Sequence, residues 1–255
     1  MANRNCNHLF SDYGRLEHIY GLEYLKTDQT QEMFGMFKDC NSLKNLDVSR
    51  FDTSQVKNMG WMFAECGSLE SLDVGHFDTS QVKGMKCMFY KCSSLKSLDV
   101  SRFVTNRATD LSFMFSNCDS LENLDVSRFD TSQVKDMKCM FYKCSSLKNL
   151  DVSHFNTSQV KDMSYMFTCC DGLKSLDVSH FFTSQVTDME YMFSSCGSLE
   201  SLDISHFFTS QVKNMKYMFA SCSSLKNLDV SYFDTSQVTD LSFMFYGCKV
   251  WKAWM

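Results

Sequence analysis

The sequence predicts an α/β solenoid with short parallel strands on one face and short helices on the other. Two observations predict this fold class. A 26-residue repeat runs along nearly the whole chain, and each copy contains two different apolar spacings. A fixed period of this length is typical of stacked supersecondary units that cover one another. The eight full copies begin at Leu43, Leu69, Leu95, Leu121, Leu147, Leu173, Leu199 and Leu225.

The opening segment of each copy predicts a short strand. Positions within a copy are numbered here from its first leucine. In the first full copy, Leu46 and Val48 alternate with Asp47 and Ser49. Apolar and polar residues that alternate with a period of two indicate a strand with one buried face. Equivalent strands of adjacent copies would lie parallel, roughly 5 Å apart.

The second half of each copy predicts a short helix. Met59, Met62, Phe63 and Cys66 have the spacing of one apolar face of a helix. Asp or Asn precedes this segment in most copies, as Asn58 does here, and either residue can cap a helix that starts beside it. A helix of about two turns is unstable alone, so adjacent copies would have to stabilise it.

The repeats and their flanks divide the chain into three parts. One divergent copy precedes the eight full ones, so the predicted solenoid covers residues 17–248. Residues 1–20 are predicted to form an N-terminal cap, and residues 249–255 a short C-terminal cap. Caps are expected because the end units of a solenoid have no neighbour to cover one face.

Composition and motifs argue against several classes of protein. The net charge is −5 and the lysines are spread along the repeats, which predicts no nucleic-acid partner. No apolar run is long enough to span a bilayer, and the N-terminus MANRNCNHLF lacks the hydrophobic core of an export signal. No nucleophile–base pair, glycine-rich phosphate loop or metal motif occurs, so we expect no enzyme activity, no cofactor and no metal site.

Two phrases of the repeat resemble known families. The opening Leu-x-x-Leu-x-Val-x-x-Phe is similar to the strand segment of leucine-rich repeats, with Phe where that family has Asn or Cys. The fuller SLKNLDVSHFNTSQVKDMSYMFTCC resembles the 26-residue repeats of BspA-like bacterial surface proteins, which also occur in Mycoplasma-type lipoproteins. The resemblance implies a right-handed, leucine-rich-repeat-like coil stack. It also implies a secreted or cell-surface role in adhesion or in binding a host or partner protein.

An intracellular function is the alternative to this role. Members of the family typically carry an export signal, and none is visible in the sequence. The alternative is therefore a cytoplasmic structural or scaffold solenoid that self-associates. The sequence patterns fit both functions.

Stacking would turn each repeat position into a column, and aspartate fills position 5 in all eight full copies. We expect this column on the concave surface. Carboxylates 5 Å apart repel by about 0.8 kcal/mol even in water, so the column needs compensation. Serine at position 7 and Arg or His at position 8 would supply it. A bound calcium ion or a basic partner are the alternatives. The candidate binding residues of this column are Asp125, Asp151, Asp177 and Asp203.

Cysteine and threonine form two further columns. Nine of the 13 cysteines recur once per copy on the predicted core face, which favours reduced, packed thiols over disulfides between copies. Threonine at position 11, such as Thr131, predicts a hydrogen-bonded structural ladder, with ice binding as the alternative. Aromatic residues recur at position 19, as at Tyr165, and we expect them to be partly buried rather than a fully exposed stripe.

Departures from the repeat mark the candidate binding surface. Phe182 and Phe208 replace the usual Asp of position 10 in two adjacent copies. Histidine occupies position 8 nearby, at His154, His180 and His206. An exposed aromatic and imidazole cluster is a candidate contact for a protein or glycan ligand on the turn or concave surface. The alternative is that the two rings pack on each other and on the turn.

Overall fold

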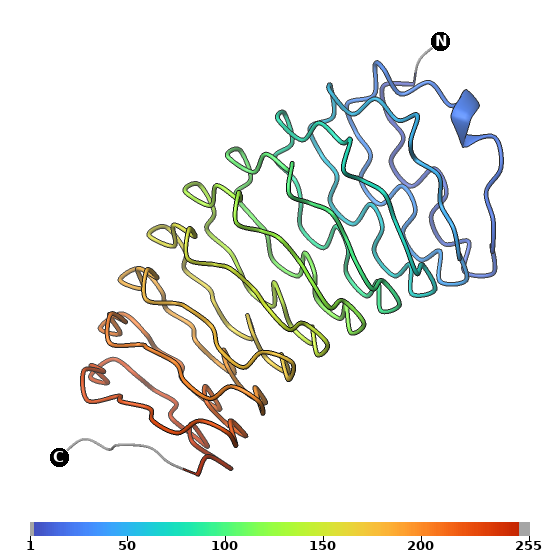
Figure 1. The fold of residues 1–255 in the computed structure, drawn as a ribbon. Helices are drawn as coiled ribbons and strands as arrows, with labels where there is room; N and C mark the ends of the chain where they lie inside the picture. Colours follow the sequence, from blue (N-terminus) through green and yellow to red (C-terminus); the bar gives the residue numbers. More distant parts are fainter. Residues whose placement is uncertain (1–2, 250–255) are drawn as a thin grey trace.

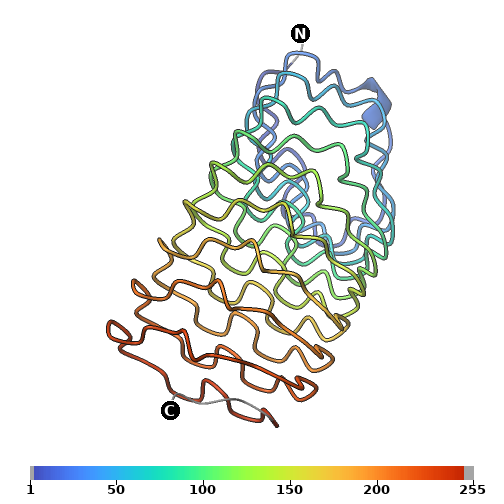
Figure 2. The same ribbon diagram turned by 60° about the vertical axis from the view of Figure 1, so that its left-hand side comes forward.

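The protein is an elongated stack of coils, one coil per repeat (Figure 1). The computed structural model describes residues 3–249, whose first and last members lie at opposite ends of the stack (Figure 2). The predicted solenoid is confirmed. Residues 250–255, nearly all of the predicted C-terminal cap, lie outside the described residues. Within the described part, the one regular element is η1, a 3-10 helix at Leu22–Tyr24.

The predicted helix in the second half of each coil is wrong, because positions 17–24 form consecutive turns. The Met62 N–H donates to the Met59 carbonyl at 3.1 Å, three residues back, as in a β-turn. Trp61 between them has a φ of 60°, which a right-handed helix cannot contain. Its own N–H points out of the coil and donates to the Lys86 carbonyl of the next coil at 2.9 Å.

This turn geometry recurs in every full coil. A positive φ occurs at position 19 in Trp61, Cys87, Phe113, Cys139, Tyr165, Tyr191, Tyr217 and Phe243. The apolar spacing does not distinguish the two structures, because consecutive turns and a helix both place residues three and four apart on the same face of the segment. Turns are favoured over a helix because they leave every second backbone N–H free to donate to a carbonyl of the adjacent coil. A helix would direct those groups back into its own backbone.

The acidic residue before this segment caps no helix. Asp136 accepts the N–H of Lys138 at 2.9 Å, which is an Asx turn. The backbone of the same residue pairs with its equivalents Asp110 and Asp162 in isolated parallel bridges. Position 16 therefore forms a backbone bridge between adjacent coils that recurs along the stack.

The predicted strands are wrong as continuous strands, although their alternation is confirmed. Val126 is buried and its neighbour Asp125 is exposed. Coils pair here only through isolated parallel bridges, such as that between Asn123 and Asn149. The Asp125 side chain explains the short pairing, because its Oδ1 takes the Ser127 N–H at 3.0 Å and turns the chain.

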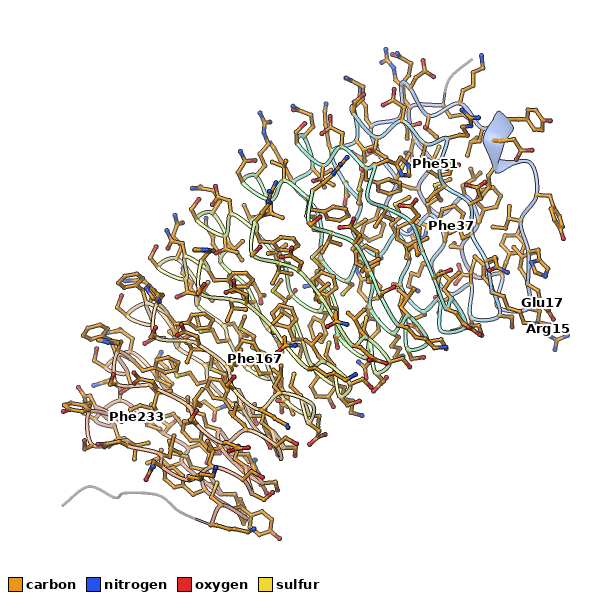
Figure 3. All side chains as sticks on the ribbon, in the orientation of Figure 1. Arg15, Glu17, Phe37, Phe51, Phe167 and Phe233 are labelled. Atoms are coloured by element: carbon orange, nitrogen blue, oxygen red, sulfur yellow. The ribbon has the colours of Figure 1, made fainter. Side chains whose placement is uncertain are left out.

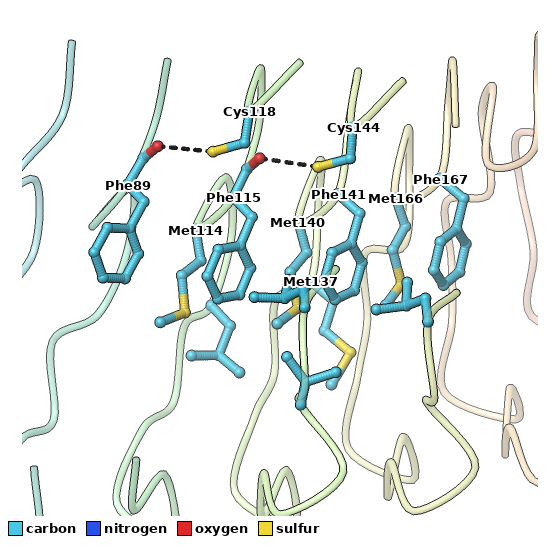
Figure 4. Packing of buried hydrophobic residues seen from close by; sticks show 14 of the residues in the cluster. Phe89, Met114, Phe115, Cys118, Met137, Met140, Phe141, Cys144, Met166 and Phe167 are labelled. Atoms are coloured by element: carbon cyan, nitrogen blue, oxygen red, sulfur yellow. Dashed lines mark hydrogen bonds between the residues drawn. The ribbon is translucent and has the colours of Figure 1, made fainter. Parts of the chain in front are cut away.

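The core is a set of side-chain columns that run the length of the stack, and phenylalanine forms the largest. Phe141 stacks face to face on Phe115 at 5.9 Å and on Phe167 at 5.7 Å, with 8° between the ring planes in both pairs. Figure 3 labels Phe37 and Phe167 of this column at different points along the stack, and Figure 4 shows its central rings from close by. Burying each ring contributes several kcal/mol to stability, so the column is a large source of stability.

The cysteine column lies beside these rings. The Cys144 thiol donates to the Phe115 carbonyl of the preceding coil at 3.2 Å (Figure 4), and the equivalent cysteines do the same in the other coils. All thirteen cysteines are free thiols in the structure. Burial raises the pKa of Cys118 to about 12, so this thiol is a neutral hydrogen-bond donor at physiological pH.

The threonine column is also structural. The Thr131 hydroxyl donates to the Asn156 carbonyl of the next coil at 3.0 Å, and the side chain is buried. A buried threonine cannot contact ice, so the ice-binding alternative does not hold for this column. Among residues 3–249, every buried side-chain nitrogen or oxygen has a hydrogen-bond partner.

The N-terminal segment repeats the coil geometry before the first predicted repeat. His8 and Asp12 have φ values of 54° and 67°, four residues apart, like positions 19 and 23 of a full coil. The His8 N–H donates to the Phe34 carbonyl at 3.0 Å and the Asp12 N–H to the Lys38 carbonyl at 2.8 Å. Part of the segment predicted as a cap is therefore a half coil.

Candidate binding surfaces

The first candidate surface is the turn patch, which consists of Phe182, Phe208, His180, His206 and Tyr232. These residues occupy positions 8 and 10 of three consecutive coils. Phe182 is 57% exposed, Phe208 59% and Tyr232 70%. Exposure of this size argues against the alternative in which the two phenylalanine rings bury each other. His154 holds the same position one coil earlier, beside Asn156 instead of a phenylalanine.

The two phenylalanines of the turn patch replace a residue that helps to form the turn. In a typical coil, Asp130 accepts the Ser132 N–H at 3.0 Å through its Oδ1. Phenylalanine cannot accept that bond, so the coils at Phe182 and Phe208 lose one local contact each. Their backbones still follow the repeat, because the Thr157 hydroxyl donates to the Phe182 carbonyl at 3.0 Å. Coil formation therefore does not explain these aromatic side chains.

The aspartate column is compensated from within the chain, as predicted. Asp125 Oδ1 accepts the Ser127 hydroxyl at 2.6 Å in addition to the Ser127 N–H. These two bonds hold the pKa of Asp125 below its ordinary value, and the nearby Arg128 guanidinium lowers it slightly further. No group of three or more His, Cys, Asp or Glu residues within 3–249 is arranged to hold a metal ion.

The structure brings some of the predicted site residues together. The Ser179 hydroxyl donates to Asp177 Oδ1 at 2.7 Å and lies 3.0 Å from His180 Nδ1, so it links the aspartate column to the turn patch. Asp177 and Asp203 also line a shallow hollow of about 530 Å³ that extends to Asp229. Asp125 and Asp151 keep the same geometry but do not line this hollow.

A second surface, which we call the aromatic edge, was only partly recognised in the sequence. It consists of the aromatic residues at positions 19 and 22. Where position 19 is Cys, position 22 is Tyr, as in Cys139 with Tyr142. Where position 19 is aromatic, position 22 is a small residue in most coils, as in Phe113 with Ser116. Comparing the two positions copy by copy would have found this exchange. The residues are Trp61, Tyr90, Phe113, Tyr142, Tyr165, Tyr191, Tyr217, Phe243 and Tyr246.

The aromatic edge has two different geometries along its length. From Tyr165 onward the position-19 rings stack face to face, with centroids 4.8 Å apart for Tyr165–Tyr191 and 4.6 Å for Tyr191–Tyr217. Earlier rings meet edge to face, at 6.2 Å for Tyr142–Tyr165. Most position-19 side chains are half-buried, which confirms the expected partial burial, although the ring of Phe243 is 57% exposed.

These features define a class of protein: a repeat solenoid of leucine-rich-repeat-like type, with its sequence variation on the outer surfaces. No helix within residues 3–249 has the length and apolar character needed to cross a membrane. The chain belongs to the family described as "Mycoplasma protein of unknown function, DUF285", whose profile matches residues 4–123, 94–175 and 170–254. The resemblance to Mycoplasma-type repeats is thereby confirmed.

Solved structures of bacterial repeat proteins resemble the chain weakly. A leucine-rich cell surface protein from Faecalibacterium prausnitzii is 19% identical, over 93% of this chain and 73% of that protein, with a TM-score of 0.42. An internalin from Listeria monocytogenes is 13% identical, over 92% and 84% of the two chains, with a TM-score of 0.34. No curated protein is significantly similar to this chain.

Proposed function

We propose that this chain is a non-enzymatic binding module that captures a partner protein through the turn patch, in an adhesive role at a cell surface. Partner binding is assigned here to residues that depart from the repeat. The shared positions build the stack, and the turn patch is the departure that removes a turn contact and exposes aromatic rings in its place.

The observation that carries the proposal is the exposure of Phe182 and Phe208 on adjacent coils. Exposed aromatic clusters beside imidazole groups are frequent centres of protein interfaces, because large rigid rings bury much area at low entropic cost. Tyr232 extends the cluster onto the next coil, which enlarges the apolar area available to one partner.

Restoring the repeat residue tests the proposal without disturbing the fold. In the double variant Phe182→Asp/Phe208→Asp, each new carboxylate gains the turn N–H of Ser184 or Ser210, so the melting temperature should stay equal or rise. Binding to a panel of purified extracellular-matrix and serum proteins, measured by surface plasmon resonance, should fall by about a hundred-fold for any protein that the wild type binds.

The chain offers a matched control for this variant. Val104 also replaces Asp at position 10, is 40% exposed, and lies three coils before Phe182. Val104→Asp makes the same kind of change outside the turn patch and should leave binding unchanged. Equal binding by the wild type and the double variant, or equal losses in both variants, would exclude the turn patch as the contact.

A further inference from the structure

The aromatic edge contains a pocket of about 200 Å³, lined by residues of the four consecutive coils that begin at Leu69, Leu95, Leu121 and Leu147. Four rings line it, from Tyr90, Phe113, Tyr142 and Tyr165. A space of this size holds the equivalent of about six or seven water molecules. It is too small for a helix about 10 Å across and suits a single ring-sized group.

The pocket exists because large and small residues alternate there. Ser116 interrupts the position-22 rings between Tyr90 and Tyr142, and Cys139 interrupts the position-19 rings between Phe113 and Tyr165. The two small side chains line the same space. The bounding rings meet edge to face, at 6.1 Å for Tyr90–Phe113 and 6.2 Å for Tyr142–Tyr165. Edge-to-face pairs cover fewer ring faces than stacked pairs do, although Tyr165 also stacks on Tyr191.

The polar groups that line the pocket are cationic or neutral, although the Glu190 carboxylate contacts Tyr165. Lys138 lines it, with its ammonium 6.0 Å from the centre of the Tyr165 ring and 4.0 Å from Asp162 Oδ2, a loose ion pair. The Lys143 ammonium lies 5.5 Å from the centre of the Tyr142 ring. No carboxylate lines the pocket in the described part of the chain. Asn117 adds an amide to the lining.

The thiol of Cys139 is not a reactive group. The side chain is 6% exposed, and burial raises its pKa to about 12. A neutral thiol is a poor nucleophile and a poor metal ligand, so the pocket is suited to binding rather than to chemistry. The two ammonium groups near its rings disfavour a cationic guest of the quaternary-ammonium type that aromatic cages often hold, although Asp162 and Glu190 offset part of their charge.

We propose that this pocket binds one carboxylate-bearing pyranose ring, such as a hexuronic or sialic acid residue of an acidic glycan. The apolar C–H face of the sugar packs against the tyrosine and phenylalanine rings that line the pocket. The carboxylate pairs with Lys138, and the Asn117 amide contacts a ring hydroxyl. This site lies on a different part of the coil from the turn patch and does not depend on it.

A filling substitution tests the pocket directly. Cys139→Phe introduces the ring that most coils carry at position 19, and the pocket offers it room. A glycan array with uronic, sialic and matched neutral pyranoses, followed by titration calorimetry of the best ligand, should show binding by the wild type. The filled variant should bind about ten-fold or more weakly, while Cys139→Ser, which is similar in size to Cys, should keep the affinity.

Two more variants separate the ring and charge contributions. Tyr142→Ala should weaken binding, whereas Tyr246→Ala, the same repeat position outside the pocket, should not. Lys138→Gln should cost about ten-fold for acidic sugars and remove their advantage over neutral ones. The proposal is overturned if no acidic pyranose binds, if neutral counterparts bind equally to the wild type, or if Cys139→Phe binds as the wild type does.

These outcomes are distinct from those for the turn patch. The variant Phe182→Asp/Phe208→Asp leaves every pocket residue in place and should keep sugar binding. Cys139→Phe leaves the turn patch unchanged and should keep binding to a protein partner. A variant that keeps the binding its own site is proposed to provide therefore identifies which of the two proposals fails.

Discussion

The two stretches of the aromatic edge show how one fold carries two different surfaces. Between Tyr90 and Tyr165 the rings alternate between two positions and line an open pocket. Between Tyr165 and Phe243 they occupy one position and form a closed stack, with ring centres 4.6 to 4.8 Å apart. The phenylalanine column beneath is the same in both, at 5.9 Å for Phe115–Phe141 and 5.7 Å for Phe193–Phe219. The spacing of the phenylalanine column is therefore independent of the ring pattern of the aromatic edge.

The largest expected effect tests whether the core is equal in the two stretches. Phe141→Ala and Phe193→Ala each remove a fully buried ring that stacks on two neighbours. Each should cost about 3–5 kcal/mol in free energy of unfolding. Urea denaturation, fitted with a nearest-neighbour repeat model, measures both. A large difference between the two losses would mean that the surface pattern does affect the core.

A smaller effect should distinguish the two surfaces themselves. Tyr191 stacks on rings at both sides, whereas Tyr142 has one edge-to-face contact at 6.2 Å. Tyr191→Ala should therefore destabilise the protein by about 1 kcal/mol more than Tyr142→Ala. Thermal melts of the two variants measure the difference. Equal losses would show that the closed stack has no energetic advantage over the alternating pattern.

Much of this architecture is predictable from the sequence, and the errors have physical causes. The period and the apolar positions correctly place side chains such as Phe141 and Cys144 in the core. The helix prediction fails because apolar spacing cannot reveal the positive φ of Tyr165, a residue that rarely adopts it. The strand prediction fails because Asp125 bonds locally to Ser127. The turn patch was visible as a departure, but the pocket needed the relation between two positions on different coils.

The smallest expected effect concerns two aspartates with opposite pKa shifts. Burial raises the pKa of Asp188, and the neighbouring Asp162 raises it further. The ionised carboxylate therefore costs stability at neutral pH, and this cost disappears below the ordinary pKa of about 3.9, where the carboxyl is protonated in both states. Asp188→Asn should raise the melting temperature slightly at pH 7 and not at pH 3. Asn214 shows that Asn fits this position, because it accepts the Lys216 N–H at 3.1 Å.

Asp125→Asn should have the opposite sign at neutral pH. The Ser127 bonds lower the pKa of Asp125, so its carboxylate adds stability above the ordinary pKa and loses that contribution as pH falls through the lowered value. The exposed site limits the loss at pH 7 to less than about 1 kcal/mol. Melting curves of Asp188→Asn and Asp125→Asn at pH 7 and pH 3 measure both changes in stability. A stabilised Asp125→Asn at pH 7 would show that repulsion within the column outweighs its hydrogen bonds.

Shared positions hold the stack together, and we propose that the turn patch, a departure from the repeat, binds the partner. The most direct test measures melting and partner binding on the same sample of Phe182→Asp/Phe208→Asp, which restores the repeat residue at both sites. We expect an equal or higher melting temperature together with loss of partner binding. A variant that keeps its partner, or one that melts well below the wild type, would contradict it.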